Sequence, residues 1–180
     1  RIGRRRRGDE GGGAGSVRLV TWNTLWRFGD WGPRQVGLAD GLSALEPDVV
    51  LLQETWPDQA GSLAAACDLE VLGFSGGYFD QKLSSVPVDA EFGNAILART
   101  GRIEIDEAFP APGDPAPRRL LAATIDGRRI ATSHLTHLGH AGEVRADQLE
   151  RIVGWLGDPD DGRQDTGQDR SVVVGAGGPH

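Results

Sequence analysis

The chain has 180 residues, of which 38% are hydrophobic and 25% are charged. This length and balance allow one folded domain with its own core, and they exclude an intrinsically disordered protein. The formal net charge is −7 although residues 1–16 hold five arginines, so the rest of the chain is acidic. An acidic body argues against binding of nucleic acid by charge alone. No apolar run approaches the ~20 residues that cross a bilayer, and no apolar signal segment is visible. We therefore expect no membrane span and a cytoplasmic location.

In chain order, residues 1–16 are expected to form a disordered Arg/Gly-rich tail, and residues 17–180 one domain. Within this domain the pattern predicts strands at 17–23, 47–55, 69–74, 93–99, 103–109, 120–125, 129–133 and 171–175, and helices at 34–46, 62–68 and 142–156. In the last helix, the apolar residues expected to face the core are Leu149, Ile152, Val153 and Leu156. The alternation of strands and helices predicts a layered α/β fold with helices outside the sheet.

Three of the expected strands end in polar residues that can carry chemistry, namely Asn23, Glu54 and His134. Glu54 follows four consecutive aliphatic residues, and a carboxylate at the end of such a buried strand is costly unless a cation meets it. Carboxylate and amide oxygens suit Mg²⁺ or Mn²⁺, and a histidine beside them can donate to a phosphate oxygen. The set favours phosphoester hydrolysis, but the spacing alone leaves alternatives open. Asn23 could cap a turn, Glu54 could pair with an arginine, and His134 could be a core residue.

Five short motifs, in this order along the chain, resemble those of the endonuclease/exonuclease/phosphatase family, the superfamily of pancreatic-type deoxyribonuclease. They are Trp22-Asn23, Gln53-Glu54, Gly93 to Arg99, Ser133-His134-Leu135 and Arg145 to Leu149. The resemblance covers about residues 17–175. It implies a four-layer αββα sandwich in which two packed sheets have helices outside, in agreement with the order of elements predicted above.

The same resemblance implies a role for four residues and a cofactor. Glu54 is the expected principal ligand of Mg²⁺ or Mn²⁺, with Asn23 at the metal and phosphate, His134 as a donor to the scissile phosphate, and Asn94 lining the substrate site. The implied partner is a phosphoester substrate, and its class stays undecided among nucleic acid, phospholipid and inositol phosphate. No obligate protein partner is evident.

The chain departs from the family pattern after the last expected strand. Where the family has G-D-x-N, this sequence has Gly175-Ala176-Gly177-Gly178, and it ends before the segment in which the family places an Asp-His pair. We therefore expect a truncated chain with an incomplete second half of the sandwich and with poor activity of its own. The alternative is a non-catalytic interaction module on the same fold.

A zinc hydrolase is a further alternative, because His134, His137 and His140 recur every three residues. Three imidazoles are a common ligand set for catalytic Zn²⁺. The cluster starts at an expected strand end and continues past Gly139 into a loop, so its convergence on one metal depends on the loop conformation.

Overall fold

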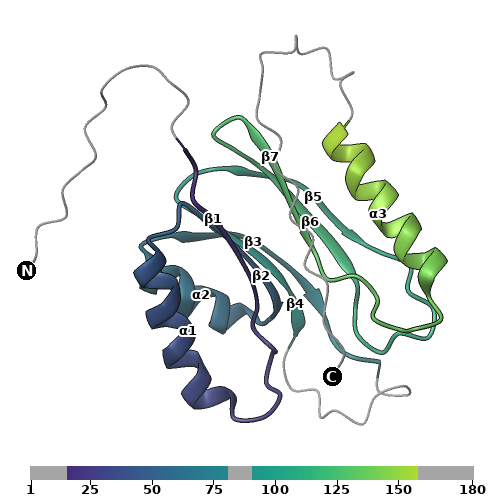
Figure 1. Cartoon of the computed structure of the whole chain (residues 1–180), viewed down its shortest axis with the longest axis horizontal. Coiled ribbons are helices and arrows are strands. Elements are labelled where there is room, and N and C mark those ends of the chain that lie inside the picture. Colours follow the sequence, from purple (N-terminus) through teal and green to yellow (C-terminus); the bar gives the residue numbers. More distant parts are fainter. Residues whose placement is uncertain (1–15, 81–90, 158–180) are drawn as a thin grey trace, which may run out of the picture.

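The computed structural model describes residues 16–80 and 91–157, which form two β-sheets packed face to face between helices (Figure 1). The first sheet has the strand order β1-β2-β4-β3, and the second has the order β5-β6-β7. The strands are β1 Leu19–Asn23, β2 Val49–Thr55, β3 Glu70–Gly77, β4 Phe92–Ala98, β5 Arg102–Ala108, β6 Arg119–Ile125 and β7 Arg128–Ser133. The helices are α1 Trp31–Leu45, α2 Pro57–Cys67 and α3 Gly142–Gly157.

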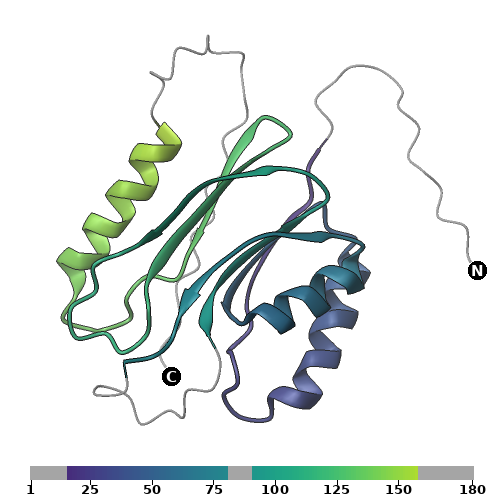
Figure 2. The ribbon, with the colours of Figure 1, turned by 180° about the vertical axis from the view of Figure 1, so that it is seen from behind.

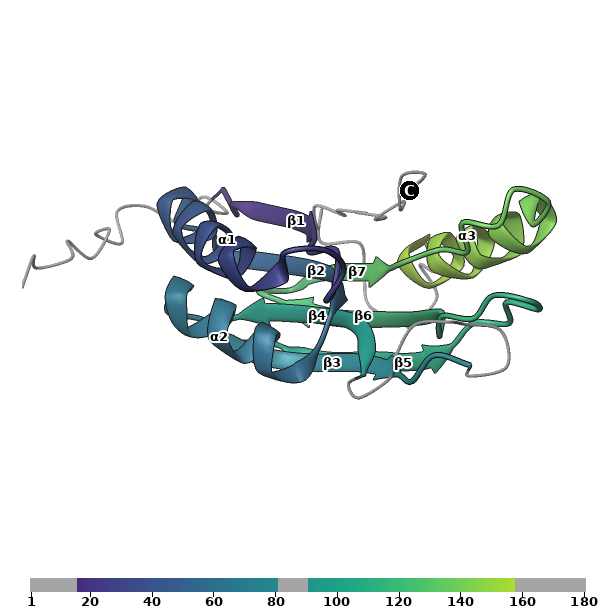
Figure 3. The ribbon, with the colours of Figure 1, turned by 90° about the horizontal axis from the view of Figure 1, so that it is seen from below.

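The layers follow the order helix, sheet, sheet, helix. Helices α1 and α2 cover the outer face of the first sheet, and α3 covers the outer face of the second (Figure 2). Seen from below, each strand of the second sheet lies at the same height as one strand of the first: β7 with β2, β6 with β4, and β5 with β3 (Figure 3). The four-layer αββα sandwich expected from the sequence is confirmed for the described residues.

Each interface between layers has its own apolar core, because the central strands bury both of their faces. Along β2, Val50 and Leu52 face the helices, whereas Val49 and Leu51 face the second sheet. All seven residues of β2 are buried, as the continuous aliphatic run predicts. A third core lies between the second sheet and α3 and includes Ile152 and Leu156.

The β1–α1–β2 segment places two strand ends side by side. Strands β1 and β2 run parallel, and their register pairs Asn23 with Gln53, next to Glu54. Parallel neighbouring strands end at the same edge of a sheet, so the polar residues that terminate β1 and β2 share one edge. The order strand, helix, buried strand in the sequence therefore predicts this local geometry correctly.

Helices α2 and α3 differ most from the sequence-based expectation. Helix α2 begins at Pro57, five residues before Ser62, because proline lacks only an N–H that the first helical turn leaves unbonded. In α3 the buried face holds Gln148, Ile152 and Leu156, whereas Leu149 and Val153 are 38% and 58% exposed. The apolar pattern was thus right about Ile152 and Leu156 and wrong about Leu149 and Val153, because a buried glutamine occupies part of the core-facing side.

Several expectations concern residues outside the described ranges. These are the Arg/Gly-rich tail up to residue 15, the strand at 171–175, and Ala176 and Gly178, which occupy the altered G-D-x-N positions. Across 16–80 and 91–157, every helix is too short or too polar to pass through a lipid bilayer.

Candidate active site

Glu54 lies at an irregular end of β2 that redirects its side chain. The pairing of β2 with β4 is regular from Val49 to Leu52 and then shifts before Thr55, so that Gln53 and Glu54 form a bulge opposite Asn94. Glu54 has a φ of 53°, a left-handed conformation that is rare outside glycine and occurs disproportionately at functional sites. Its carbonyl accepts hydrogen bonds from the Thr24 hydroxyl at 2.7 Å and the Trp26 N–H at 2.8 Å. A side chain and a backbone N–H of the segment after β1 therefore hold the strained residue in place.

The carboxylate of Glu54 is the meeting point of three strand ends. Its Oε1 accepts a hydrogen bond from Nδ2 of Asn23 at 2.8 Å and lies 3.5 Å from Nε2 of His134. The side chains of Glu54 and His134 are only 3% and 6% exposed. Asn23 comes from the first sheet with Glu54, whereas His134 follows β7 of the second. The structure thus brings together the three residues that the sequence singled out.

Asn94, the fourth expected site residue, lies on β4 against the start of β6. Its Nδ2 donates to the carbonyl oxygen of Arg119 at 3.1 Å, and the same carbonyl accepts from the Ser133 hydroxyl at 3.0 Å. This fixes the orientation of the amide, so its Oδ1 is an acceptor; it is buried and has no hydrogen-bond partner among the described residues. Asn94 is 2% exposed, and it offers an acceptor next to the residue that precedes His134.

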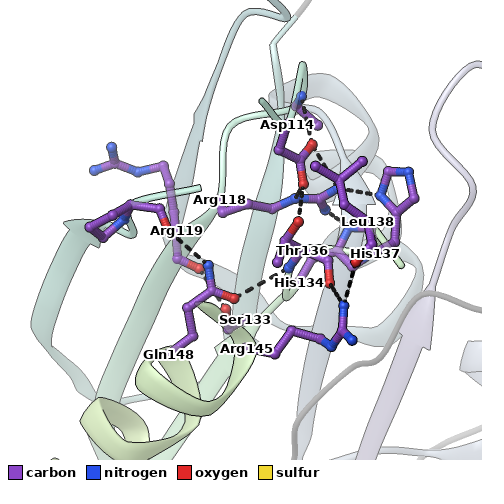
Figure 4. Close-up of polar contacts among 12 residues, drawn as sticks. Asp114, Arg118, Arg119, Ser133, His134, Thr136, His137, Leu138, Arg145 and Gln148 are labelled. Atoms are coloured by element: carbon purple, nitrogen blue, oxygen red, sulfur yellow. Dashed lines mark hydrogen bonds and ion pairs between the residues drawn. The ribbon is translucent and has the colours of Figure 1, made fainter. Parts of the chain in front are cut away.

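A buried charge network behind His134 was not predicted from the sequence (Figure 4). Arg118 donates from Nε to Asp114 at 2.8 Å, and from Nη1 and Nη2 to the Nδ1 atoms of His134 and His137, each at 2.8 Å. The side chains of Arg118 and Asp114 are 1% and 0% exposed. Both residues come from a Pro-rich loop whose sequence shows no periodic pattern, and the spacing of four between two opposite charges is the sequence signal that could have found the pair.

The carboxylate of Asp114 stays charged because its partners outweigh its burial. Burial by itself raises the pKa of Asp114. Hydrogen bonds from Arg118 and Thr136, the positive charge of Arg118 and the N–H of Ala116 act in the opposite direction and leave the pKa below its ordinary value. The Thr136 hydroxyl donates to Asp114 at 2.6 Å, so the network also ties down the loop that follows His134.

The motif Arg145 to Leu149 on α3 fixes that same loop (Figure 4). Arg145 donates from Nη1 to the carbonyl of Leu138 at 2.7 Å, and the amide of Gln148 accepts from the Thr136 N–H at 3.3 Å and donates to the carbonyl of Pro110 at 3.2 Å. Two side chains three residues apart on one helix face thus bind loop backbone that has no strand partner. This explains why arginine and glutamine occur at this spacing.

The three histidines of the zinc alternative do not converge. His134 is buried, whereas His137 and His140 are exposed, and His137 turns its Nδ1 toward the cationic Arg118. Among the described residues, which include all three of them, no group of three or more His, Cys, Asp or Glu is arranged to hold a metal. The structure therefore does not support a three-imidazole zinc site.

Comparison with known proteins identifies the family. The model of the endonuclease/exonuclease/phosphatase family matches residues 20–175. The chain belongs to this family. Endonuclease/exonuclease/phosphatase proteins are a family of phosphoester hydrolases. A search of curated proteins finds no match to the chain.

Solved structures of this family share the fold at low sequence identity. Danio rerio TDP2 complexed with a single-strand DNA product has a TM-score of 0.56 and 19% identity, over 89% of this chain and 59% of that one. An endonuclease/exonuclease/phosphatase protein from Beutenbergia cavernae has a TM-score of 0.55 and 22% identity, over 80% and 44%. A mannosyl-6-phosphatase from Bacteroides thetaiotaomicron has a TM-score of 0.53 and 18% identity, over 81% and 62%. This chain therefore spans less than two thirds of the length of each.

Endonuclease/exonuclease/phosphatase enzymes generally use divalent metals. In this chain, Glu54 with Asn23 beside it would hold such an ion. Glu54 supplies a buried carboxylate oxygen at a strand end, a hard ligand of the kind that Mg²⁺ and Mn²⁺ bind. Mg²⁺ characteristically binds through one or two carboxylates and keeps other positions for water and substrate phosphate. Asn23 directs its Nδ2 at Glu54 while its Oδ1 accepts from the Leu25 N–H at 2.9 Å, so in this arrangement it orients the carboxylate.

Proposed function

We propose that the protein is a metal-dependent phosphoester hydrolase whose site is built on Glu54, Asn23, His134 and Asn94, within a domain spanning residues 17–180. The observation that carries the proposal is the convergence of Asn23 and His134 on one oxygen of Glu54, from strand ends in two different sheets. Groups scattered over three strands meet at one point, and the chain belongs to a family of phosphoester hydrolases.

The proposed cofactor is Mg²⁺ or Mn²⁺, held by Glu54 with Asn23 beside it. When bound, the metal neutralises negative charge that develops on a phosphate group. Glu54 contributes the negative charge that attracts the cation, and its burial in a low-dielectric environment strengthens that attraction. Asn23 holds the carboxylate in one orientation through the 2.8 Å hydrogen bond.

The remaining residues act on the phosphoester itself. His134 presents Nε2 on the side of Glu54, where a phosphate oxygen can accept a hydrogen bond from it. Asn94 offers its buried Oδ1 as an acceptor for a substrate hydroxyl or a water molecule. We propose a phosphoester as substrate and leave its class open among nucleic acid, phospholipid and inositol phosphate. TDP2 was solved with DNA and another structural relative is a mannosyl-6-phosphatase, so the shared fold accepts different phosphoesters.

We also propose that this chain by itself is a poor catalyst. Ala176 and Gly178 stand where the family motif has Asp and Asn, so the side chains that position water and phosphate are missing at those positions. Loss of such groups typically lowers a rate by orders of magnitude. Metal binding depends on Glu54 and Asn23, so we expect it to persist.

Binding of Mn²⁺ tests the proposal, because the electron paramagnetic resonance signal of free Mn²⁺ falls when the ion binds. We expect the wild type to bind Mn²⁺ in competition with Mg²⁺, and Glu54→Gln to weaken binding at least about tenfold by removing the ligand charge. Glu70→Gln is the matched control, since Glu70 is an exposed glutamate at the opposite end of the sheet. Slow Mg²⁺-dependent hydrolysis of bis(p-nitrophenyl) phosphate should disappear in Glu54→Gln.

Three results would contradict the proposal. Equal Mn²⁺ binding by wild type and Glu54→Gln would exclude this carboxylate as the ligand. Tight stoichiometric zinc without Mn²⁺ binding would favour a zinc protein instead. A folded chain that neither binds Mn²⁺ nor hydrolyses the substrate would favour a non-catalytic interaction module.

A further inference from the structure

Arg118 lies between three ionisable side chains, Asp114, His134 and His137. Its Nε and Nη2 donate to the two oxygens of Asp114 at 2.8 and 3.2 Å. Its Nη1 and Nη2 lie 2.8 Å from the Nδ1 atoms of His134 and His137. A single buried guanidinium therefore connects a carboxylate on one side with two imidazoles on the other.

The chemistry of the guanidinium determines which histidine nitrogen carries the proton. Arginine stays protonated in proteins and has only donors, so a ring nitrogen facing it must supply a lone pair. The Nδ1 atoms of His134 and His137 are then acceptors, and in each neutral imidazole the proton lies on Nε2. In His134 this N–H lies on the side of the ring nearest to Glu54, at 3.5 Å.

We propose that Arg118 is a positioning residue that holds His134 and His137 as Nε2–H tautomers. It makes His134 a hydrogen-bond donor toward the site formed with Glu54, and it prevents Nδ1 from taking part in proton transfer. The meaning of this for catalysis rests on the proposed function, whereas the tautomers themselves do not.

The surroundings of Arg118 support a dedicated positioning role. Asp114 accepts from two of its nitrogens and cannot turn away, because the Ala116 N–H and the Thr136 hydroxyl also bind that carboxylate. The planar guanidinium has donors in fixed directions, which allows it to meet a carboxylate and two imidazoles together. The ring of Phe92 lies 6.0 Å from that of His134 and limits rotation of the imidazole. Lysine, with one nitrogen, would not reproduce this arrangement.

Nuclear magnetic resonance of the ¹⁵N-labelled full chain tests the proposal at neutral pH. The chain has only four histidines, so long-range ¹H–¹⁵N spectra can resolve each ring, and His→Gln variants assign them. We expect lone-pair-type Nδ1 and N–H-type Nε2 resonances for His134 and His137. In Arg118→Met both Nδ1 resonances should shift, because each loses its donor. In Arg118→Lys at most one should keep its wild-type position.

Arg119→Met is the matched control, since this adjacent arginine binds Asp106 and Ser75 through its side chain and contacts neither histidine that way. It should leave both Nδ1 resonances unchanged. The proposal is overturned if wild-type His134 carries its proton on Nδ1, or if both Nδ1 resonances are the same in wild type and Arg118→Met. Arg118→Lys keeps the buried charge, so it and the wild-type spectrum still decide the matter if Arg118→Met does not fold.

A phosphate titration followed by the same spectra separates this proposal from the proposed function. Adding inorganic phosphate with Mg²⁺ should shift the Nε2 resonance of His134 if a phosphate group binds beside it. Expected tautomers with no response to phosphate would contradict the phosphoester site and support the positioning role alone. A phosphate response together with a His134 that is protonated on Nδ1 would support the phosphoester site and contradict the positioning role.

Discussion

Gln53 on β2 donates from Nε2 to the hydroxyl of Thr132 on β7 at 2.9 Å, and this hydrogen bond joins the two sheets. Both residues are 1% exposed. Gln53 comes one residue before Glu54, and Thr132 comes two residues before His134. The bond therefore ties together the two strand ends from which the carboxylate and the imidazole of the candidate site project.

This relationship can be measured with a double-mutant cycle on Gln53→Leu and Thr132→Val. Each single change leaves a buried polar group with fewer partners, and we expect it to lower the free energy of unfolding by about 1–3 kcal/mol. The double variant should lose less than the sum of the two, because neither partner is then left behind. Urea denaturation of the four proteins gives the coupling, and strictly additive losses would show that the two side chains do not interact.

Asn23→Asp tests whether the site is designed for a cation. The new carboxylate would lie beside Glu54, where Asn23 now donates at 2.8 Å, and two like charges at that distance repel. We expect a lower melting temperature without metal and a larger rise on addition of Mg²⁺ than in the wild type. Asn23→Ala is the companion variant, which removes the hydrogen bond without adding charge. Equal Mg²⁺ responses in the wild type and Asn23→Asp would argue against a metal at this point.

Asp114→Asn should change how the free energy of unfolding depends on pH in the acidic range. The folded-state pKa of Asp114 lies below its ordinary value, so the carboxylate contributes its full stability above the unfolded-state pKa of about 3.9 and loses it as the pH falls through the folded-state value. At neutral pH, breaking this buried pair should cost about 3–5 kcal/mol. Denaturant unfolding from pH 7 to pH 3 should show the difference between wild type and variant shrinking at the acid end. A difference that is constant over this range would contradict the assignment.

Gln148→Leu separates the observed face of α3 from the face that the apolar pattern predicted. The substitution extends an apolar stripe but removes the partners of the Thr136 N–H and the Pro110 carbonyl, so we expect a loss of about 1–3 kcal/mol. Leu149→Ala and Val153→Ala change exposed side chains and should each stay within about 0.5 kcal/mol. Thermal melts of the three variants give the ranking, and the opposite order would restore the sequence-based prediction.

The sequence by itself determined the order of the elements and the residues that end them. The aliphatic run before Glu54 can only be buried on both faces, and a strand, a helix and a strand in succession place Asn23 beside the end of β2. These inferences depend on neighbours within a few residues, or on one short connection, and the chain sequence contains that information directly.

Only the tertiary structure determined which residues surround His134. Arg118 and His134 are 16 residues apart, and Gln53 and Thr132 are 79 apart, so no local pattern indicates either contact. Asp114 and Arg118 lie in a proline-rich loop without periodicity, and the inward rotation of Gln148 depends on backbone groups contributed by two other segments. Such polar partners are required because buried donors and acceptors must be hydrogen-bonded. These groups become buried only when the two sheets pack together.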